Sequence, residues 1–233
     1  MPPLLRAERL SAVPGLIHGF TRRTDADGRL LSFPRDATPA QWEHLGALLD
    51  TPNARFSFLS QVHGATALLA DRAGNLGEGD GLVTTKRGTF LVIRTADCVP
   101  VLFLGQGDDL GAAHAGWRGT AAGIVPQTIA AMPSTPTVAV IGPCISVENY
   151  EVGDEVVDAI AAAGVPHERF VRRDLGPRPH VDLRAAVQWQ LEHAGVPSIA
   201  ILPHCTFADD NLHSYRREGR KVGSMASVIG WAR

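Results

Sequence analysis

Three segments of the chain carry side chains of the kind that bind a catalytic metal ion. His63, Cys98 and His114 each follow an apolar stretch and are each flanked by small or turn-forming residues. Two histidines and one cysteine are a ligand set that zinc uses in catalytic sites, where a fourth position stays open for water or substrate. The residue types therefore predict one site in which these three side chains bind Zn²⁺.

Each of the three side chains also has a purely structural explanation. His63 fits a turn, Cys98 a small buried apolar position, and His114 a core imidazole with hydrogen-bond partners. Their separations along the chain are long, unlike the local spacing of H-E-x-x-H or C-x-x-C motifs, so spacing does not choose between the explanations. Their shared position at strand ends, where strands pass into site-forming loops, favours a common site.

Other polar residues near these segments are candidates for binding anions or moving protons. A guanidinium group can hold phosphate or carboxylate at two points, which makes four arginines candidates: Arg23, Arg118, Arg216 and Arg217. Arg118 follows Trp117 and lies close in sequence to the histidine of the same segment, so we expect it in a pocket. Asp80 could be an acid or base, although its position between two glycines also fits a turn.

The composition limits the classes of protein to which the chain can belong. It has 233 residues, of which 45% are hydrophobic, so one large core is possible and we expect a single domain over residues 1–233. The net charge of −2 favours neither nucleic acid nor an anionic membrane as a partner. No stretch approaches the roughly 18 apolar residues of a membrane span, and no signal peptide is recognisable, so we expect a cytoplasmic protein, plausibly a monomer.

The three cysteines of the chain, Cys98, Cys144 and Cys205, form no C-x-x-C motif. Such an odd and sparse set disfavours a disulfide framework and also a structural zinc finger. We therefore expect each cysteine to be either a free thiol or a metal ligand.

Strand-like and helix-like segments alternate along the chain and predict an α/β fold. The first turn of a helix at 120–132 is expected to point N–H groups toward His114, which would suit an anion. The segment 172–179 is expected to be a mobile loop. We expect hairpin-like strands within 4–20 and one further strand on each side of His63. The other predicted strands are 81–85, 89–94, 99–104, 110–114, 137–141 and 198–202. The other predicted helices are 38–49, 153–163 and 183–193.

Taken in order, the motifs of the chain resemble those of the laccase-domain family, also called the multicopper polyphenol oxidase or peptidoglycan editing factor family. The resemblance covers nearly the whole chain. It is carried by Gly19-Phe20 with Arg23, Gln61-Val62-His63-Gly64, Asp80-Gly81-Leu82-Val83-Thr84, Thr95-Ala96-Asp97-Cys98-Val99-Pro100, His114-Ala115-Gly116-Trp117-Arg118-Gly119, Ile141-Gly142-Pro143-Cys144-Ile145, Tyr150-Glu151-Val152-Gly153, Cys205-Thr206, and Ser214-Tyr215-Arg216-Arg217 with Gly219-Arg220.

The resemblance implies a single α/β domain built as a layered α-β-β-α sandwich with mixed sheets, and Zn²⁺ bound by the two histidines and the cysteine named above. It implies purine nucleoside chemistry, namely phosphorolysis of adenosine, inosine and methylthioadenosine and deamination of adenosine. Some members are credited instead with correcting peptidoglycan precursors that carry the wrong amino acid. The segment Thr21–Gly28 departs from the family pattern, because it lacks a pair of glycines. We expect substrate contacts from Arg23, Trp117, Arg118, Tyr215 and Arg216.

The leading hypothesis is a zinc-dependent purine nucleoside phosphorylase with adenosine deaminase activity. For deamination, zinc would supply an activated water for attack at C6 of adenine, and Asp80 or Asp97 would move the proton. For phosphorolysis, Arg118 and Arg216 would hold the phosphate that attacks the ribose.

Three other functions would use the same residues. A copper polyphenol oxidase needs a further histidine-rich cluster to reduce oxygen, and the nine histidines include no His-x-His pair. A metal-free cysteine hydrolase would use Cys98 as nucleophile and His114 as base on a peptidoglycan precursor or another amide. A zinc-stabilised binding protein would lose its fold without the metal and would show no turnover.

Overall fold

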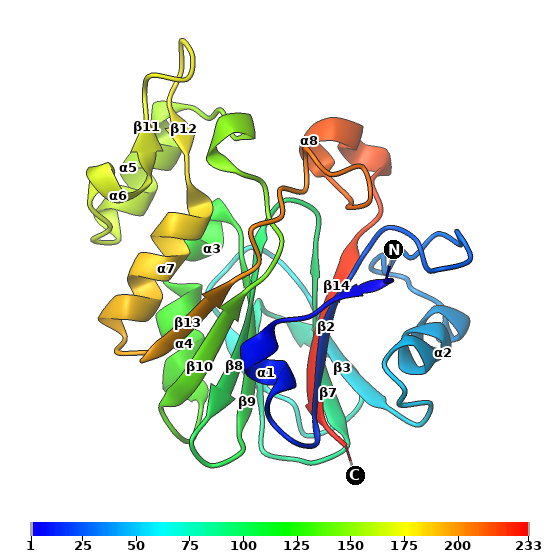
Figure 1. Cartoon of the computed structure of the whole chain (residues 1–233). Helices are drawn as coiled ribbons and strands as arrows, with labels where there is room; N and C mark the ends of the chain where they lie inside the picture. Colours follow the sequence, from blue (N-terminus) through cyan, green and yellow to red (C-terminus); the bar gives the residue numbers. More distant parts are fainter. Residues whose placement is uncertain (1, 233) are drawn as a thin grey trace.

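The computed structural model describes residues 2–232, in which two mixed sheets stack face to face (Figure 1). In order across the first sheet lie β1 (Leu4–Leu5), β2 (Leu16–Thr21), β14 (Met225–Trp231), β7 (Thr89–Thr95), β3 (Arg55–Ser60) and β5 (Gly74–Glu78). Across the second lie β13 (Ser198–Ile201), β10 (Pro136–Ile141), β8 (Val99–Gly105), β9 (Leu110–Ala115), β6 (Gly81–Thr84) and β4 (Ala67–Leu69). A separate short ribbon pairs β11 (Val171–Arg172) with β12 (His180–Val181).

Helices cover the outer face of each sheet and complete four layers. On one side α2 (Pro39–Leu48) packs on the first sheet, and on the other a group of helices packs on the second sheet (Figure 1). This arrangement confirms the predicted α-β-β-α sandwich with mixed sheets. The group comprises α3 (Trp117–Ala121), α4 (Ile124–Ala131), α5 (Asp154–Ala162), α6 (His167–Phe170) and α7 (Leu183–His193); α1 (Glu8–Ser11), α8 (Tyr215–Glu218) and 3₁₀ turns at Val147–Asn149 and Gly219–Lys221 complete the helical elements.

The central strand β7 shows why the sequence forms stacked sheets. All its residues are buried, and successive side chains point to opposite faces because a strand has a period of two. Phe90 and Val92 join the core under α2, whereas Leu91 and Ile93 join the core between the two sheets. A continuous apolar run is therefore required, since both faces of this strand are covered.

The strand β8 has the same property in the second sheet. Val101 and Phe103 face the helices of the outer layer, and Leu102 and Leu104 face the first sheet. The strand pairs with β9 on one side and with β10 on the other, in both cases antiparallel. This pairing sets Pro100 directly opposite His114 and fixes the position of that histidine at the end of β9.

The helix predicted at 120–132 is wrong in its extent. The chain turns helical at Trp117 and breaks at Gly123, whose φ of 83° is left-handed and cannot continue an α-helix. The result is α3 followed by α4 in place of one helix. The first turn after His114 therefore belongs to a helix of only one and a half turns, which removes the basis for the anion site expected there.

The N-terminal prediction also needs correction. The hairpin expected within 4–20 exists, because β1 and β2 pair antiparallel with Leu4 opposite Thr21, but α1 lies between the two strands. The strands expected on either side of His63 are β3 and β4. The segment 172–179 contains the last residue of β11 and the connection from β11 to β12. Within residues 2–232, the helices are all too short or too polar to cross a bilayer.

Candidate metal centre and cavity

The three candidate ligands meet at one end of the stacked sheets, two of them on loops and one at the end of a strand. β3 and β7 run parallel in the first sheet, so the loop containing His63 and the turn containing Cys98 leave the same edge. That turn crosses to β8 in the second sheet, where His114 lies at the end of β9. His63 and Asp97 have φ values of 61° and 87°, and these left-handed conformations bend the backbone sharply beside the site.

The structure brings His63, Cys98 and His114 together. Their ligand atoms all lie within 4.8 Å of one another, and the Cys98 Sγ is 3.9 Å from Nε2 of His63. Burial raises the pKa of the Cys98 thiol, but the charges and hydrogen bonds of the two histidines outweigh it and lower that pKa overall. The thiolate, which is the form that binds metal, is therefore favoured at this position.

Gly116 makes room for the triad. A Cβ atom at this position would lie 2.9 Å from Cδ2 of His63 and 3.0 Å from Sγ of Cys98. Both separations are too short for carbon in van der Waals contact with these side chains. The glycine that follows the histidine segment is thus needed for the close approach of the other two ligands.

Asp80 lies behind the triad and holds two of its members in place. Its carboxylate is fully buried and accepts hydrogen bonds from His114 Nδ1 at 2.7 Å and from the backbone N–H groups of His63 and Gly64 at 3.0 and 2.7 Å. Burial raises the pKa of this carboxyl group, but these bonds lower it below its usual range overall. Because a carboxylate accepts from Nδ1–H of His114, the Nε2 atom carries the free lone pair.

The position of Asp80 differs from the one expected of an acid or base. It does not line the cavity beside the triad, so it reaches that cavity only through His114. Asp97, the other candidate, does line the cavity. Its carboxylate accepts from the Thr206 hydroxyl and from the backbone N–H of Arg216.

A cavity of about 630 Å³ opens in front of the triad. Two exposed guanidinium groups line it, each placed against an aromatic ring. Arg118 lies 4.2 Å from the ring centre of Trp117, and Arg216 lies 5.3 Å from that of Tyr150. Arg216 is further held by two hydrogen bonds of 3.0 Å to the backbone carbonyl of Glu151. The cavity therefore combines cationic groups, aromatic surfaces and the candidate metal ligands.

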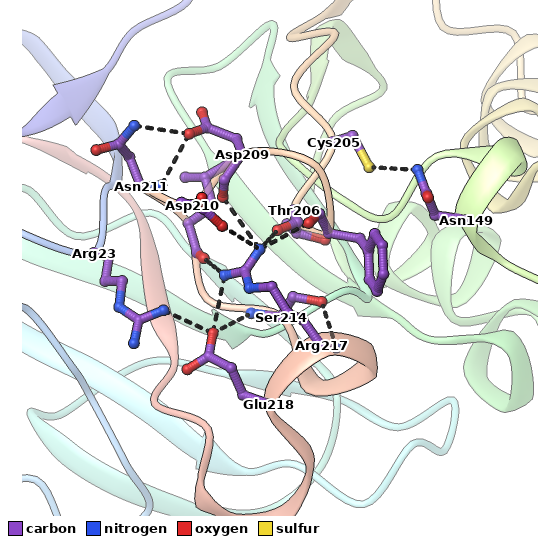
Figure 2. Close-up of polar contacts among 12 residues, drawn as sticks. Arg23, Asn149, Cys205, Thr206, Asp209, Asp210, Asn211, Ser214, Arg217 and Glu218 are labelled. Carbon is purple, nitrogen blue, oxygen red and sulfur yellow. Dashed lines mark hydrogen bonds and ion pairs between the residues drawn. The ribbon is translucent and has the colours of Figure 1, made fainter.

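Arg23 does not reach this cavity. Its Nη1 donates to Oε1 of Glu218 at 2.9 Å, and the same oxygen accepts from Arg217 (Figure 2). Arg217 also donates to backbone carbonyls of Thr206 and Leu212, so it fastens α8 to the preceding loop. The expected substrate contact at Arg23 is thus replaced by an ion pair that supports α8, the helix that carries Tyr215 and Arg216 into the cavity wall.

Sequence reasoning missed several residues of the cavity wall. Tyr150 stood in a family motif without a role, and its ring now lies beneath Arg216. Gln61 is the first residue of the His63 motif, and its amide bonds both the N–H and the carbonyl of Arg94, as a neighbouring strand would. The available signal for Tyr150 and Gln61 was that each stood inside a motif that carried the family resemblance. The remaining wall residues not expected are Arg94, Thr95, Ala96 and Ser224.

Comparison with known sequences gives one family model and several relatives that share a name. A family model described as multi-copper polyphenol oxidoreductase laccase matches residues 35–232. A purine nucleoside phosphorylase of Deinococcus radiodurans is 37% identical over 99% of this chain and 94% of its own length. Purine nucleoside phosphorylase YfiH of Escherichia coli is 34% identical over 74% of this chain and 72% of its own length.

Solved structures share the fold over the full length. Protein NMB0706 of Neisseria meningitidis superposes with a TM-score of 0.85 at 30% identity and covers 99% of this chain and 100% of its own. YlmD of Geobacillus stearothermophilus has a TM-score of 0.85 at 28% identity and covers 100% of both chains. These matches confirm the resemblance inferred from the motifs: the chain belongs to the multi-copper polyphenol oxidoreductase laccase family.

Proposed function

We propose that this protein is a metal-dependent purine nucleoside phosphorylase that binds Zn²⁺ through His63, Cys98 and His114. The observation that carries the proposal is the cavity that joins this triad to the guanidinium groups of Arg118 and Arg216. The names of the relatives supply the reaction class, and the two cationic groups supply a place for phosphate.

The donor set fits a zinc ion. It offers a favoured thiolate and a histidine whose Nε2 lone pair is freed by the bond from Nδ1 to Asp80. Gly116 leaves space beside the ligands. When bound, zinc supplies Lewis acidity, and it lowers the pKa of a coordinated water to about 7. Copper remains the alternative ion for the same donors.

Phosphorolysis requires that phosphate attack C1′ of the ribose while the C1′–N9 bond breaks and the purine leaves. Arg118 and Arg216 would bind and orient the phosphate through their forked N–H groups. The half-buried Tyr150 ring offers a face for the base, as does Trp117. Burial, together with the nearby Cys98, raises the pKa of the Tyr150 phenol, so its O–H stays available to donate a hydrogen bond to the leaving purine.

The proposal extends to adenosine, inosine and methylthioadenosine as substrates and to adenosine deamination as a second activity. Deamination needs a group that moves a proton at the C6 amino group. Asp97 is the carboxylate that lines the cavity, so it is our candidate for this role in place of Asp80.

The test combines metal content with turnover. We expect about one zinc per chain in protein purified without added metal, because the site offers three ligands to one ion. The same protein should release hypoxanthine from inosine only when phosphate is present. His63→Ala and Cys98→Ala should lose metal and base release together. Base release by metal-free protein would contradict the proposal, and so would bound zinc without any purine turnover.

A second candidate is supported by the contact between Cys98 and the two histidines. A thiol with a lowered pKa beside an imidazole is also the arrangement of a cysteine hydrolase, which here would edit peptidoglycan precursors. Trapping of a covalent Cys98 adduct with an amide substrate by metal-free protein would favour this reading. A polyphenol oxidase is less suited, because within residues 2–232 the histidine and cysteine ligands form one three-residue cluster.

A further inference from the structure

Two cysteines outside the cavity lie side by side beyond the end of the second sheet. Cys144 follows β10 and Cys205 follows β13, and these strands pair in parallel. Beyond the ends of these strands, the segments that carry Cys144 and Cys205 stay side by side. The Cys144 N–H donates to the carbonyl of His204 at 3.4 Å, and the Thr206 N–H donates to the carbonyl of Cys144 at 3.0 Å. Cys144 and Cys205 are thus directly paired residues.

This pairing is compatible with a disulfide bond. Neighbouring strands lie roughly 4.8 Å apart and directly paired residues share a face. Disulfides join cysteines whose Cα atoms are roughly 4.4–6.8 Å apart, so the backbone does not have to move far for the two sulfurs to bond. Both cysteines are free thiols in the structure.

The surroundings of Cys205 stabilise a thiolate. The residue is partly exposed, and its sulfur accepts from the backbone N–H of Ser146 at 3.3 Å. It also accepts from Nδ2 of Asn149 at 3.5 Å (Figure 2). The backbone N–H groups of Phe207 and Ala208, the two residues after Thr206, also favour the thiolate form. Burial raises the pKa of this thiol, but the hydrogen bonds outweigh burial and lower the pKa overall.

Cys144 has the opposite character. Its side chain is fully buried, and burial raises the pKa of its thiol to about 11. The positive charge of Arg184 lowers the pKa of this thiol, although by less than burial raises it. Cys205 is therefore the thiol that is open to an oxidant from solvent, and Cys144, its directly paired neighbour, is shielded from solvent. Their positions therefore suit Cys205 to react first with an oxidant and Cys144 to react afterwards with the oxidised Cys205.

We propose that Cys144 and Cys205 form a dithiol that a hydroperoxide oxidises to a disulfide. First, the Cys205 thiolate attacks the O–O bond of the hydroperoxide; an S–O bond forms, the O–O bond breaks, and the departing oxygen takes a proton and leaves as water or an alcohol. Cys205 is then a sulfenic acid. Next, the Cys144 sulfur attacks that sulfur; the S–S bond forms, the S–O bond breaks, and hydroxide leaves as water with the Cys144 proton. The sulfur pair loses two electrons, which the peroxide gains.

The dithiol is connected to the candidate metal centre. Thr206 directly follows Cys205, and its hydroxyl donates to Asp97, the residue before Cys98. The backbone N–H of Ile145, next to Cys144, donates to the Asp97 carbonyl at 3.0 Å. The inference does not depend on the reaction proposed above, because it concerns thiols that the reaction does not use.

The test treats the purified, zinc-supplied protein with hydrogen peroxide, blocks remaining thiols, and maps peptides by mass spectrometry. We expect a linked peptide pair containing Cys144 and Cys205 that dithiothreitol separates, while Cys98 stays reduced and is alkylated once the protein is denatured with a chelator. In untreated protein at neutral pH, alkylation of Cys205 should be at least about tenfold faster than that of Cys144.

Variants separate the two steps. Cys144→Ser should stop the reaction at a sulfenic acid on Cys205 that dimedone traps, and Cys205→Ser should leave Cys144 reduced. Oxidation of Cys98 without a linked peptide in the unmodified chain would overturn the proposal. Equal alkylation rates for Cys144 and Cys205 would also overturn it, and both of these readouts use the native sequence, so they stand even if a variant fails to fold.

Discussion

Asp97 and Arg216 are joined by a hydrogen bond of 2.7 Å from the backbone N–H of Arg216 to Oδ2 of Asp97. Asp97 immediately precedes Cys98, a candidate metal ligand, and Arg216 is a candidate phosphate contact on α8. The two residues are 119 positions apart in the sequence. This one bond therefore couples the loop of the metal centre to the helix that supplies a cation to the cavity.

In phosphorolysis, Asp97→Asn should raise the KM for phosphate more than it lowers kcat, because Asp97 is proposed to move a proton only in deamination. Asparagine tolerates the left-handed backbone at this position, but its amide presents one acceptor oxygen where the carboxylate presents two. Loss of one charge-assisted bond corresponds to about tenfold. We expect the KM for phosphate to rise by about that factor, with a smaller change in kcat. Asp108→Asn, another aspartate with positive φ but remote and exposed, should leave KM unchanged.

Asp80→Asn should reduce metal affinity. Asparagine cannot accept from His114 Nδ1 and from two backbone N–H groups with the same strength, so the imidazole loses its fixed orientation. Loss of such a partner lowers metal affinity about 10- to 100-fold. Competition with a chelator measures the change. Asp109→Asn removes a buried carboxylate that accepts from Ser134 at the far end of β9, and should destabilise the fold without changing metal affinity.

Gly116→Ala should disrupt the metal centre through sterics alone. The φ of −74° at this position suits alanine, but its Cβ would press on His63 and Cys98. We expect zinc content to fall well below one per chain by mass spectrometry, in a protein that still folds. Gly19→Ala, whose Cβ would make ordinary contacts with Leu4, is the matched control. Full zinc retention in the Gly116 variant would show that the triad can widen without loss of the ion.

Arginine variants should distinguish residues that bind phosphate in the cavity from a residue that only supports the cavity wall. Arg118→Met and Arg216→Met each remove a guanidinium from the cavity wall, and we expect the KM for phosphate to rise about tenfold or more, the value of a charged two-point contact. Arg23→Met breaks the ion pair with Glu218 and should change that KM by no more than about threefold, because its effect passes through α8. A loss of phosphate binding at Arg23 as large as at Arg118 would contradict the placement of Arg23.

His18 should make stability dependent on pH. It is fully buried, and burial together with nearby Arg6 lowers its pKa to about 4; its Nε2 also accepts from the Ala7 N–H, which requires a neutral ring. In the unfolded chain the imidazole binds a proton below about pH 6.5, so the unfolded state gains protons that the folded state does not. The free energy of unfolding should fall by about 3 kcal/mol as pH drops from 6.5 to 4.

Urea unfolding of metal-free protein at several pH values measures this loss, and metal-free samples exclude contributions from ligand binding. His18→Gln keeps an acceptor near Ala7 but does not titrate, so its unfolding free energy should depend less steeply on pH over the same interval. Parallel curves for the two proteins would show that His18 is not the group responsible.

The sequence alone determined the elements and the ligand types. The apolar runs of β7, β8 and β9 are long because both faces of these strands are covered, so their composition records the layered fold. The residue types at His63, Cys98 and His114 sufficed to name a ligand set, and the ordered motifs sufficed to name the family. The apolar runs, the ligand types and the ordered motifs can all be recognised along the chain without knowledge of which distant residues meet.

The tertiary structure decided which polar residues meet. Local periodicity states whether a side chain is buried but not which distant side chain faces it, because that depends on strand register and on how chains cross between sheets. Asp80 therefore looked like an acid or base but supports His114 from behind, and Arg23 looked like a substrate contact but pairs with Glu218. Tyr150 joined the cavity only because α8 packs against its loop.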